Sequence, residues 1–195
     1  MRFIDFDVKK PDFQTLKAAA ELLADDYPVV FPGDTNYGIL MRFTPENAER
    51  LHALRRENTD KPFLVVVSED FDWQALVKTD ALPRQNRDAV NTYWPGTHTL
   101  IFPKADTLAY PSADSIAIRM PAAETNRAFH TLVQLCDFPL LAPSFNRSGE
   151  PAITTQAEGA EKFGEIEYAF WDARYEPGPA SAIWDLREDP PRQIR

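Results

Sequence analysis

The sequence predicts one α/β domain over residues 1–195, built around a twisted mixed β-sheet that is flanked by helices. A chain of 195 residues suits a single hydrophobic core. Short apolar runs alternate with longer segments of helical periodicity, and no repeat, low-complexity tract or linker interrupts the alternation. The 17 prolines, carried largely by the expected loops, favour a mixed sheet over a uniformly parallel one.

Two helices and three strands are expected in the first third of the chain. Apolar residues recur at helical spacing from Phe13 to Leu23, and Asp12 precedes them as a cap. A second helix is predicted to start at Thr44–Glu46, which supplies a capping hydroxyl, a proline at the first helical position and an acid near the positive end of the helix dipole. Short apolar runs predict strands at 29–31, 37–41 and 63–67.

The remaining two thirds of the chain continue the same alternation. Helices are predicted around residues 70–78, 83–93, 125–135 and 155–163. Strands are predicted at 100–102, 115–120, 139–142, 182–184 and 192–194.

Charge and composition restrict the classes of function. The formal net charge of -9 opposes tight nucleic-acid binding through a general electrostatic footprint, although a local basic patch is compatible with it. Cys136 is the one cysteine, so no internal disulfide forms, and its apolar neighbours favour a buried structural thiol in a reducing compartment. The histidines His52, His98 and His130 are too scattered in the sequence to suggest a zinc motif, although folding could still bring them together, and no metal site is predicted.

No targeting or membrane segment is expected from the sequence. Residues 1–5 lack the basic start and the apolar stretch of a signal peptide. No run approaches the ~20 apolar residues that a membrane span requires. We therefore expect a cytoplasmic protein without a membrane partner.

The seven glycines exclude the common nucleotide-binding loops. No two of them lie two residues apart, so a G-x-G-x-x-G fingerprint is impossible. Gly33 and Gly38 have P-loop spacing, but an Ile-Leu pair follows where Lys and Ser or Thr are needed. Gly159 and Gly164 share this spacing and are followed by Glu165.

Four polar segments lie beside predicted strand ends, where open α/β sheets usually place ligands. Taken alone, the segment 32–38 is best interpreted as a hairpin turn, and the cations of 55–62 are ordinary partners of a helix C-terminus. The segment 142–149 fits either a capped turn or an anion-binding concavity of backbone N–H groups. In 115–121, strand alternation points Arg119 to a face that normally packs, so an internal ion pair and a ligand role are both open for it.

Six segments match known motifs in chain order. Pro32–Gly38 is similar to P-T-D/E-T-x-Y-G, and Ser115–Pro121 is similar to S/T-V/I-A-V/I-R-x-P. Pro143–Gly149 is similar to P-S-A-N-x-S-G. The other matching segments are Asp60–Val67, Tyr93–Thr99 and Ser181–Asp185, with Arg195 at a terminal arginine position. From about Val29 onward, the chain thus resembles the YrdC-like family of threonylcarbamoyl-AMP synthases.

This resemblance implies a YrdC-like fold with a concave cavity. It implies an enzyme that joins L-threonine, bicarbonate and ATP into threonylcarbamoyl-AMP, which supplies the t6A modification of tRNA. Magnesium is expected with the triphosphate, because it offsets charge during attack on the α-phosphate.

The resemblance also assigns roles to residues. Arg119 would bind the threonine carboxylate, with Thr35 and Ser181 helping to hold the amino acid; a guanidinium fork suits a carboxylate. Arg55 and Lys61 are the expected catalytic residues. The expected contacts to ATP are Ser115, Ser144, Asn146 and Arg195.

The chain departs from the family at positions tied to catalysis. The family's K-x-R falls on Arg55–Glu57, so a carboxylate stands where a phosphate-binding arginine is expected. A desolvated carboxylate beside a triphosphate is repulsive by several kcal/mol. Val66 stands where the family has a histidine on the threonine side of the site. Gly33 and Ala182 each stand where the family motifs have a threonine. Arg56 and Lys61 are the cations that could take the place of the phosphate-binding arginine missing at Glu57.

These departures resemble the YciO-type paralogues and keep other hypotheses open. One is a non-synthase paralogue that binds a nucleotide or double-stranded RNA. Binding of such RNA or of tRNA is expected to be weak at a net charge of -9. Another is a structural or interaction domain whose site has decayed.

Overall fold

The computed structural model describes residues 1–58, 62–111 and 113–195. The strands are β1 (Arg2–Asp5), β2 (Val29–Pro32), β3 (Tyr37–Arg42), β4 (Leu64–Val66), β5 (His98–Pro103), β6 (Ser115–Arg119), β7 (Leu140–Leu141), β8 (Tyr168–Trp171), β9 (Ala182–Asp185) and β10 (Arg192–Gln193). The α-helices are α1 (Phe13–Ala24), α2 (Pro45–Arg55), α3 (Arg84–Tyr93), α4 (Arg127–Leu135) and α5 (Gln156–Lys162). Two 3-10 turns, η1 (Trp73–Leu76) and η2 (Thr79–Ala81), precede α3.

Within the described residues, the strands form one sheet in the order β1-β8-β2-β3-β7-β4-β6-β5-β9-β10. The pairs β1–β8, β2–β8, β4–β6 and β5–β9 are parallel. The pairs β2–β3, β3–β7, β4–β7, β5–β6 and β9–β10 are antiparallel. The mixed sheet with flanking helices confirms the predicted fold class.

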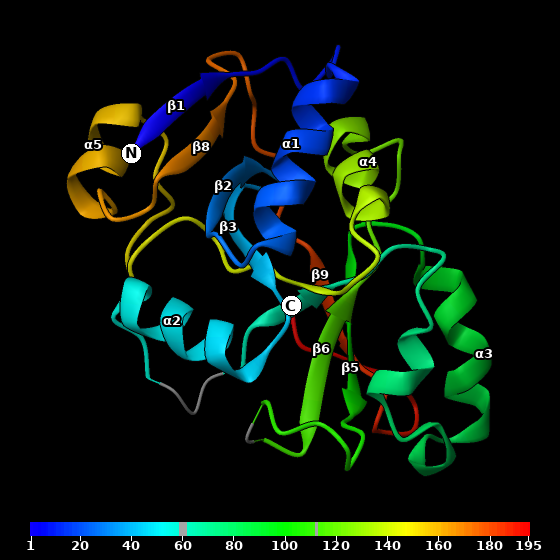
Figure 1. The fold of residues 1–195 in the computed structure, drawn as a ribbon. Helices are drawn as coiled ribbons and strands as arrows, with labels where there is room; N and C mark the ends of the chain where they lie inside the picture. The colour runs from blue at the N-terminus through cyan, green and yellow to red at the C-terminus, as the bar shows by residue number, and fades with distance from the viewer. Residues whose placement is uncertain (59–61, 112) are drawn as a thin grey trace.

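The sheet carries a hydrophobic cluster on each face, because neighbouring residues of a strand point to opposite sides. On one face, Phe31 and Val66 belong to a cluster with residues of α1 and α4. On the other, Val30 and Val65 belong to a cluster with residues of α2 and α3. Figure 1 shows α1 and α4 side by side, and these two helices are in contact. The face that α1 and α4 cover is the one on which Arg119 of β6 also lies.

Side-chain caps fix where the helices begin. Asp12 accepts a hydrogen bond from the Thr15 amide (2.8 Å), and Thr44 accepts one from the Asn47 amide (3.1 Å). Both caps match the sequence prediction. Each satisfies an amide that has no partner within the first helical turn.

Two features differ from the sequence prediction. The helix expected at 70–78 is replaced by the turns η1 and η2. Its backbone pairs instead with the end of β5, since Val77 bridges Lys104 and the Lys78 amide donates to the Pro103 carbonyl. The strands β1 and β8 were not predicted. They pair with each other across more than 160 residues of sequence, and local periodicity does not report such a contact.

Candidate functional site

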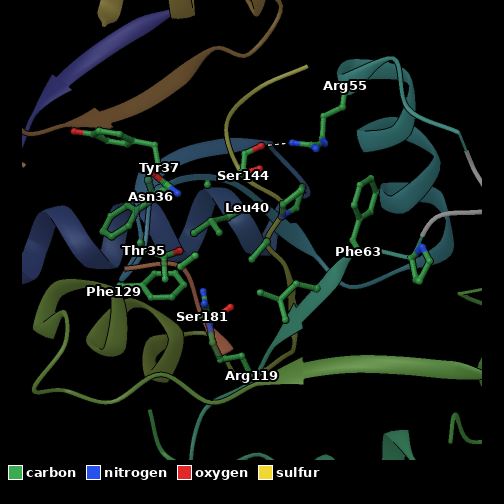
Figure 2. A pocket seen from close by; sticks show the side chains of 18 of the residues that line it. Thr35, Asn36, Tyr37, Leu40, Arg55, Phe63, Arg119, Phe129, Ser144 and Ser181 are labelled. Atoms are coloured by element: carbon green, nitrogen blue, oxygen red, sulfur yellow. Dashed lines mark hydrogen bonds between the residues drawn. The ribbon is translucent and has the colours of Figure 1, made fainter. Parts of the chain in front are cut away.

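A cavity of about 350 Å³ opens on the α1–α4 face of the sheet. Its apolar walls come from β2, β3, α4 and the start of β4, through Phe31, Leu40, Phe129, Phe63 and Leu64. Figure 2 shows Arg119, Ser181 and Thr35 on one side of this space, with Arg55 and Ser144 across it. The volume lies within the range of small-molecule sites, which begins at about 300 Å³.

Strand pairing assembles the first polar end of the cavity. Arg119, the last residue of β6, lies opposite Val66 of β4 and Thr99 of β5. Because β9 pairs with β5, Ser181 is brought beside Thr99, and their hydroxyl oxygens are 3.2 Å apart. The Arg195 guanidinium donates from Nε to the Ser181 carbonyl (3.1 Å) and from Nη2 to its hydroxyl (3.2 Å).

Arg119 is buried beside the carboxylate of Asp34, whose side chain is fully buried. The Arg119 Nη2 and Asp34 Oδ1 atoms are 2.8 Å apart. This close approach is not aligned as a hydrogen bond: Arg119 Nε and both Asp34 oxygens lack a hydrogen-bond partner among the described residues. Burial lowers the pKa of Arg119, an effect that the Asp34 charge opposes. Asp34 therefore compensates the charge of Arg119, but the Nε donor of the guanidinium keeps no acceptor among the described residues.

The turn between β2 and β3 places Thr35 on the cavity. The Gly33 amide donates to the Asn36 carbonyl (3.0 Å), and a Cβ at Gly33 would stand 2.8 Å from that carbonyl oxygen. The turn is therefore too tight for the threonine that the family motif carries at Gly33. Asn126, the N-cap of α4, and Tyr175 both donate to the Gly33 carbonyl and hold the turn in place. The segment is both a hairpin turn and a cavity wall, the two alternatives left open by the sequence.

Arg55 and the 144–148 loop form the second polar end. Arg55 donates from Nε to Glu57 Oε2 (3.0 Å), and from Nη1 to the Ser144 carbonyl and to Asn146 Oδ1 (3.0 Å). The Ser144 hydroxyl donates to the same Asn146 oxygen (2.6 Å). Ser148 donates to the other oxygen of Glu57 (3.0 Å). Glu57 is thus held in an ion pair with Arg55, and both side chains are buried.

Three aromatic side chains, His52, Phe63 and Tyr110, pack together next to this polar end. The His52 ring of α2 stacks on Phe63, with ring centroids 4.2 Å apart. Tyr110 accepts a hydrogen bond from the Phe63 amide (2.8 Å). Neither His52 nitrogen has a hydrogen-bond partner among the described residues, and burial lowers the pKa of this histidine.

The structure brings most of the sequence-predicted residues to one cavity. Arg55, Glu57 and the residues Thr35, Arg119, Ser144, Ser181 and Arg195 line it. Asn146 lies behind Arg55, in hydrogen-bond contact with it. Ser115 lies at the opposite end of β6 from Arg119, paired with Pro103, and is not among the lining residues. Lys61 lies outside the described residues.

Sequence reasoning missed two partners of this site. It expected a carboxylate or a ligand beside Arg119 but did not single out Asp34, although this acid stands within a polar turn after a strand. It treated Glu57 as a charge facing a ligand, whereas Glu57 is bound to Arg55 and Ser148. The sequence signal that could have indicated this ion pair was an acid two residues after an arginine.

The described residues contain no group of three or more His, Cys, Asp or Glu side chains arranged to hold a metal ion. Among the same residues, no helix is long and apolar enough to cross a membrane. Cys136 is buried, as predicted, and burial raises the pKa of its thiol to about 12.

Fold and site together define a class: a mixed α/β domain whose cavity has an arginine and hydroxyls at each polar end. A protein-family model, Sua5_yciO_yrdC, described as telomere recombination, matches residues 21–195. The chain belongs to this family, which confirms the resemblance drawn from its motifs.

The curated relatives include a threonylcarbamoyl-AMP synthase of Pyrococcus abyssi, 30% identical over 185 residues, which cover 92% of this chain and 53% of that protein. A threonylcarbamoyl-AMP synthase of Xanthomonas campestris is 30% identical over 151 residues, covering 75% of this chain and 79% of that protein. The chain spans about half the length of the Pyrococcus abyssi relative.

Solved structures show the same fold. Sua5 of P. abyssi complexed with L-threonine has a TM-score of 0.84 at 26% identity, covering 100% of this chain and 57% of that one. YciO of E. coli has a TM-score of 0.80 at 16% identity, covering 100% and 94%. The second likeness concerns the fold alone.

Proposed function

We propose that this chain binds L-threonine and ATP in its cavity and joins them with bicarbonate into threonylcarbamoyl-AMP, the precursor of the t6A modification of tRNA. Membership of the family supports this proposal. So do the threonylcarbamoyl-AMP synthases to which the chain is 30% identical and the threonine complex of the P. abyssi neighbour.

The state of Arg119 carries the proposal. A buried guanidinium normally gives its fork to a carboxylate in two parallel hydrogen bonds. Asp34 neutralises Arg119 without making those bonds, and the arginine lines the cavity. A carboxylate that enters the cavity would complete the missing hydrogen bonds. The hydroxyls of Thr35 and Ser181 lie on the same side of the cavity (Figure 2) and suit the amine and hydroxyl of threonine.

The nucleotide is assigned to the other lining groups. Ser144 at the Arg55 end and Arg195 offer a hydroxyl and a guanidinium of the kind that hold phosphates. Asn146 lies behind Arg55, and its amide nitrogen donates to the Glu150 carbonyl (2.6 Å), so it would act by holding the loop that carries Ser144. Ser115 lies away from the cavity, so a contact from it to ATP would need a ligand that reaches along β6. Magnesium would enter as part of the Mg-ATP substrate and offset charge on the triphosphate. Arg55 would orient the Ser144–Asn146 loop and present its remaining N–H groups to the ligand.

Calorimetric titration with L-threonine and with L-threoninol, which lacks the carboxylate, tests the amino-acid assignment. We expect threonine to bind at least about tenfold more tightly, the discrimination of about 1.4 kcal/mol that one charge-assisted hydrogen bond supplies. Ser181→Ala and Thr35→Val should weaken threonine binding, whereas Ser115→Ala should not. Equal binding of the two ligands, or none of threonine in the presence of ATP, would refute the assignment.

A non-synthase protein that binds a nucleotide is the second candidate. The buried Arg55–Glu57 pair favours it, because a carboxylate occupies the position of an arginine in the family motif. The two candidates differ in turnover: the non-synthase would bind adenine nucleotides without threonine-dependent release of pyrophosphate. A variant of this candidate binds double-stranded RNA. It has less support, since a net charge of -9 disfavours binding to a polyanion.

A further inference from the structure

The turn between β2 and β3 lies between two hollows of the molecule. Gly33 and Thr35 line the cavity of the candidate site. Gly33 and Asp34 also line a second hollow of about 440 Å³, together with the segment that leads into α4 and with residues 172–178. A turn with open space on both sides is fixed by individual contacts rather than by close packing.

One set of these contacts comes from residues 172–181, an irregular strap that connects β8 to β9. The strap is anchored at its start, where the Tyr37 hydroxyl donates to the Asp172 carbonyl (3.0 Å) and accepts from the Asp172 amide (3.0 Å). Further along, the backbone of Gly178 lies so close to the Asp34 carbonyl that a Cβ there has no room. The strap therefore lies directly against the turn, on the side of the second hollow.

Tyr175 of the strap contacts the turn at both of its ends. Its hydroxyl donates to the carbonyl of Gly33, the first residue after β2 (3.0 Å). Its ring packs edge-on against the ring of Tyr37, the first residue of β3, with centroids 4.8 Å apart. The two residues between these contacts that matter for the site are Asp34, which compensates Arg119, and Thr35, which lines the cavity.

The Gly33 carbonyl has two donors that approach from different elements. Asn126 donates from the start of α4, and Tyr175 donates from the strap. Burial raises the pKa of Tyr175, and the charge of Asp34 adds to this rise, so the hydroxyl keeps its proton at neutral pH and stays a donor. Asn126 also caps α4 by accepting from the Phe129 amide, whereas the Tyr175 hydroxyl makes only this one hydrogen bond among the described residues.

We infer that Tyr175 is a positioning residue for the amino-acid end of the cavity, which acts by fixing the turn that carries Asp34 and Thr35. The inference rests on the proposed function, because it concerns the residues assigned to threonine. Tyr175 is not among the residues that line the cavity, so it acts through Gly33 rather than on the substrate. A site that is already ordered binds its ligand without the cost of ordering, so a looser turn weakens binding of the amino acid.

Calorimetric titration of the wild type and of Tyr175→Phe tests the inference. Phenylalanine keeps the ring that packs on Tyr37 and removes only the hydroxyl. Each protein is titrated with α,β-methylene-ATP, whose α–β bridge is not cleaved, and then with L-threonine in the presence of that analogue. We expect threonine binding to weaken about three- to tenfold, the effect of one neutral hydrogen bond, and binding of the analogue to change less than about twofold.

This difference between the two ligands separates positioning from a merely structural role. A loss of stability alone lowers the midpoint of thermal unfolding but leaves the affinities of the folded molecules unchanged well below that midpoint. Gly178→Ala is a second, independent variant, because its methyl group would press on the Asp34 carbonyl and should also weaken threonine binding. Tyr27→Phe, which removes the hydroxyl of an exposed tyrosine, is the matched control and should change neither affinity.

Unchanged threonine affinity in Tyr175→Phe, or an equal loss for threonine and the analogue, would overturn the inference while the threonine binding of the wild type leaves the proposed function standing. If Tyr175→Phe does not fold, the threonine affinity of Gly178→Ala decides in its place. A wild type that binds the analogue but no threonine would overturn the proposed function and this inference with it.

Discussion

At the scale of single residues, the pair Arg119 and Asp34 places a buried, charge-compensated arginine in the wall of the cavity. Burial of a charge is tolerated only with compensation, and Asp34 supplies it at 2.8 Å. Sequence alternation predicted that Arg119 points toward the protein interior and left an ion pair or a ligand as its partner. The identity of the partner depends on the β2–β3 turn lying against the end of β6, which no local pattern reports.

Asp34→Asn is expected to destabilise the protein by about 3 kcal/mol or more, because it leaves the buried Arg119 charge without compensation. Urea denaturation measures this loss of unfolding free energy. Glu167→Gln is the control: Glu167 pairs with Arg2 on the surface at 3.8 Å, and its loss should cost less than about 1 kcal/mol. Equal effects of the two substitutions would show that Asp34 does not compensate Arg119.

At the scale of elements, the β2–β3 hairpin shows how a departure from the family motif is built into the backbone. The motif alone presents Gly33 as the replacement of a threonine, but the turn closes so tightly that a Cβ at this position would stand 2.8 Å from the Asn36 carbonyl oxygen. Contacts from Asn126 and Tyr175 hold the turn in that form. The tightness of this turn is visible only in three dimensions.

Gly33→Ala should therefore lower the unfolding free energy by about 1–3 kcal/mol, the usual range for an overpacked position, and weaken threonine binding through Thr35. Gly38→Ala provides the comparison, since a Cβ there makes an ordinary contact of 3.4 Å with the Pro143 carbonyl. Circular dichroism melts and threonine titration measure the two effects. A Gly33→Ala protein as stable as Gly38→Ala would contradict this reading of the turn.

Helix α2 contains a pH-sensitive contact in His52. Its folded pKa lies below the ordinary value of 6.5, because burial disfavours the charged ring. The unfolded state therefore binds the proton more readily, and the stability that this residue contributes is lost as the pH falls below about 6.5. Urea denaturation between pH 7.5 and pH 5 should show wild type losing stability relative to His52→Phe, which keeps the stack on Phe63. A difference that is constant across this range would exclude His52 as the cause.

At the scale of the whole molecule, the sequence predicted the fold class, the family and most elements of the sheet. These elements could be predicted because their signals are local in the sequence: the caps at Asp12 and Thr44, and the apolar runs of β2, β3 and β4. Two features depend on partners distant in the sequence. One is the pairing of β1 with β8, and the other is the contact of residues 70–78 with the end of β5 in place of the predicted helix.

The same limit applies to the site. The motifs singled out Arg119 and Ser144, which line the cavity, but also Ser115, which does not, and the pairing of Arg55 with Glu57 required the structure.

We propose that this cavity makes threonylcarbamoyl-AMP. Purified protein incubated with ATP, magnesium, L-threonine and isotope-labelled bicarbonate, followed by mass spectrometry of the nucleotides, tests it most directly. We expect a labelled threonylcarbamoyl-AMP that requires all three substrates, together with an equal amount of pyrophosphate, and more of both from Glu57→Arg, which restores the arginine of the family motif. Absence of the labelled product from the wild type and from Glu57→Arg, in proteins that bind ATP and threonine, would contradict the claim.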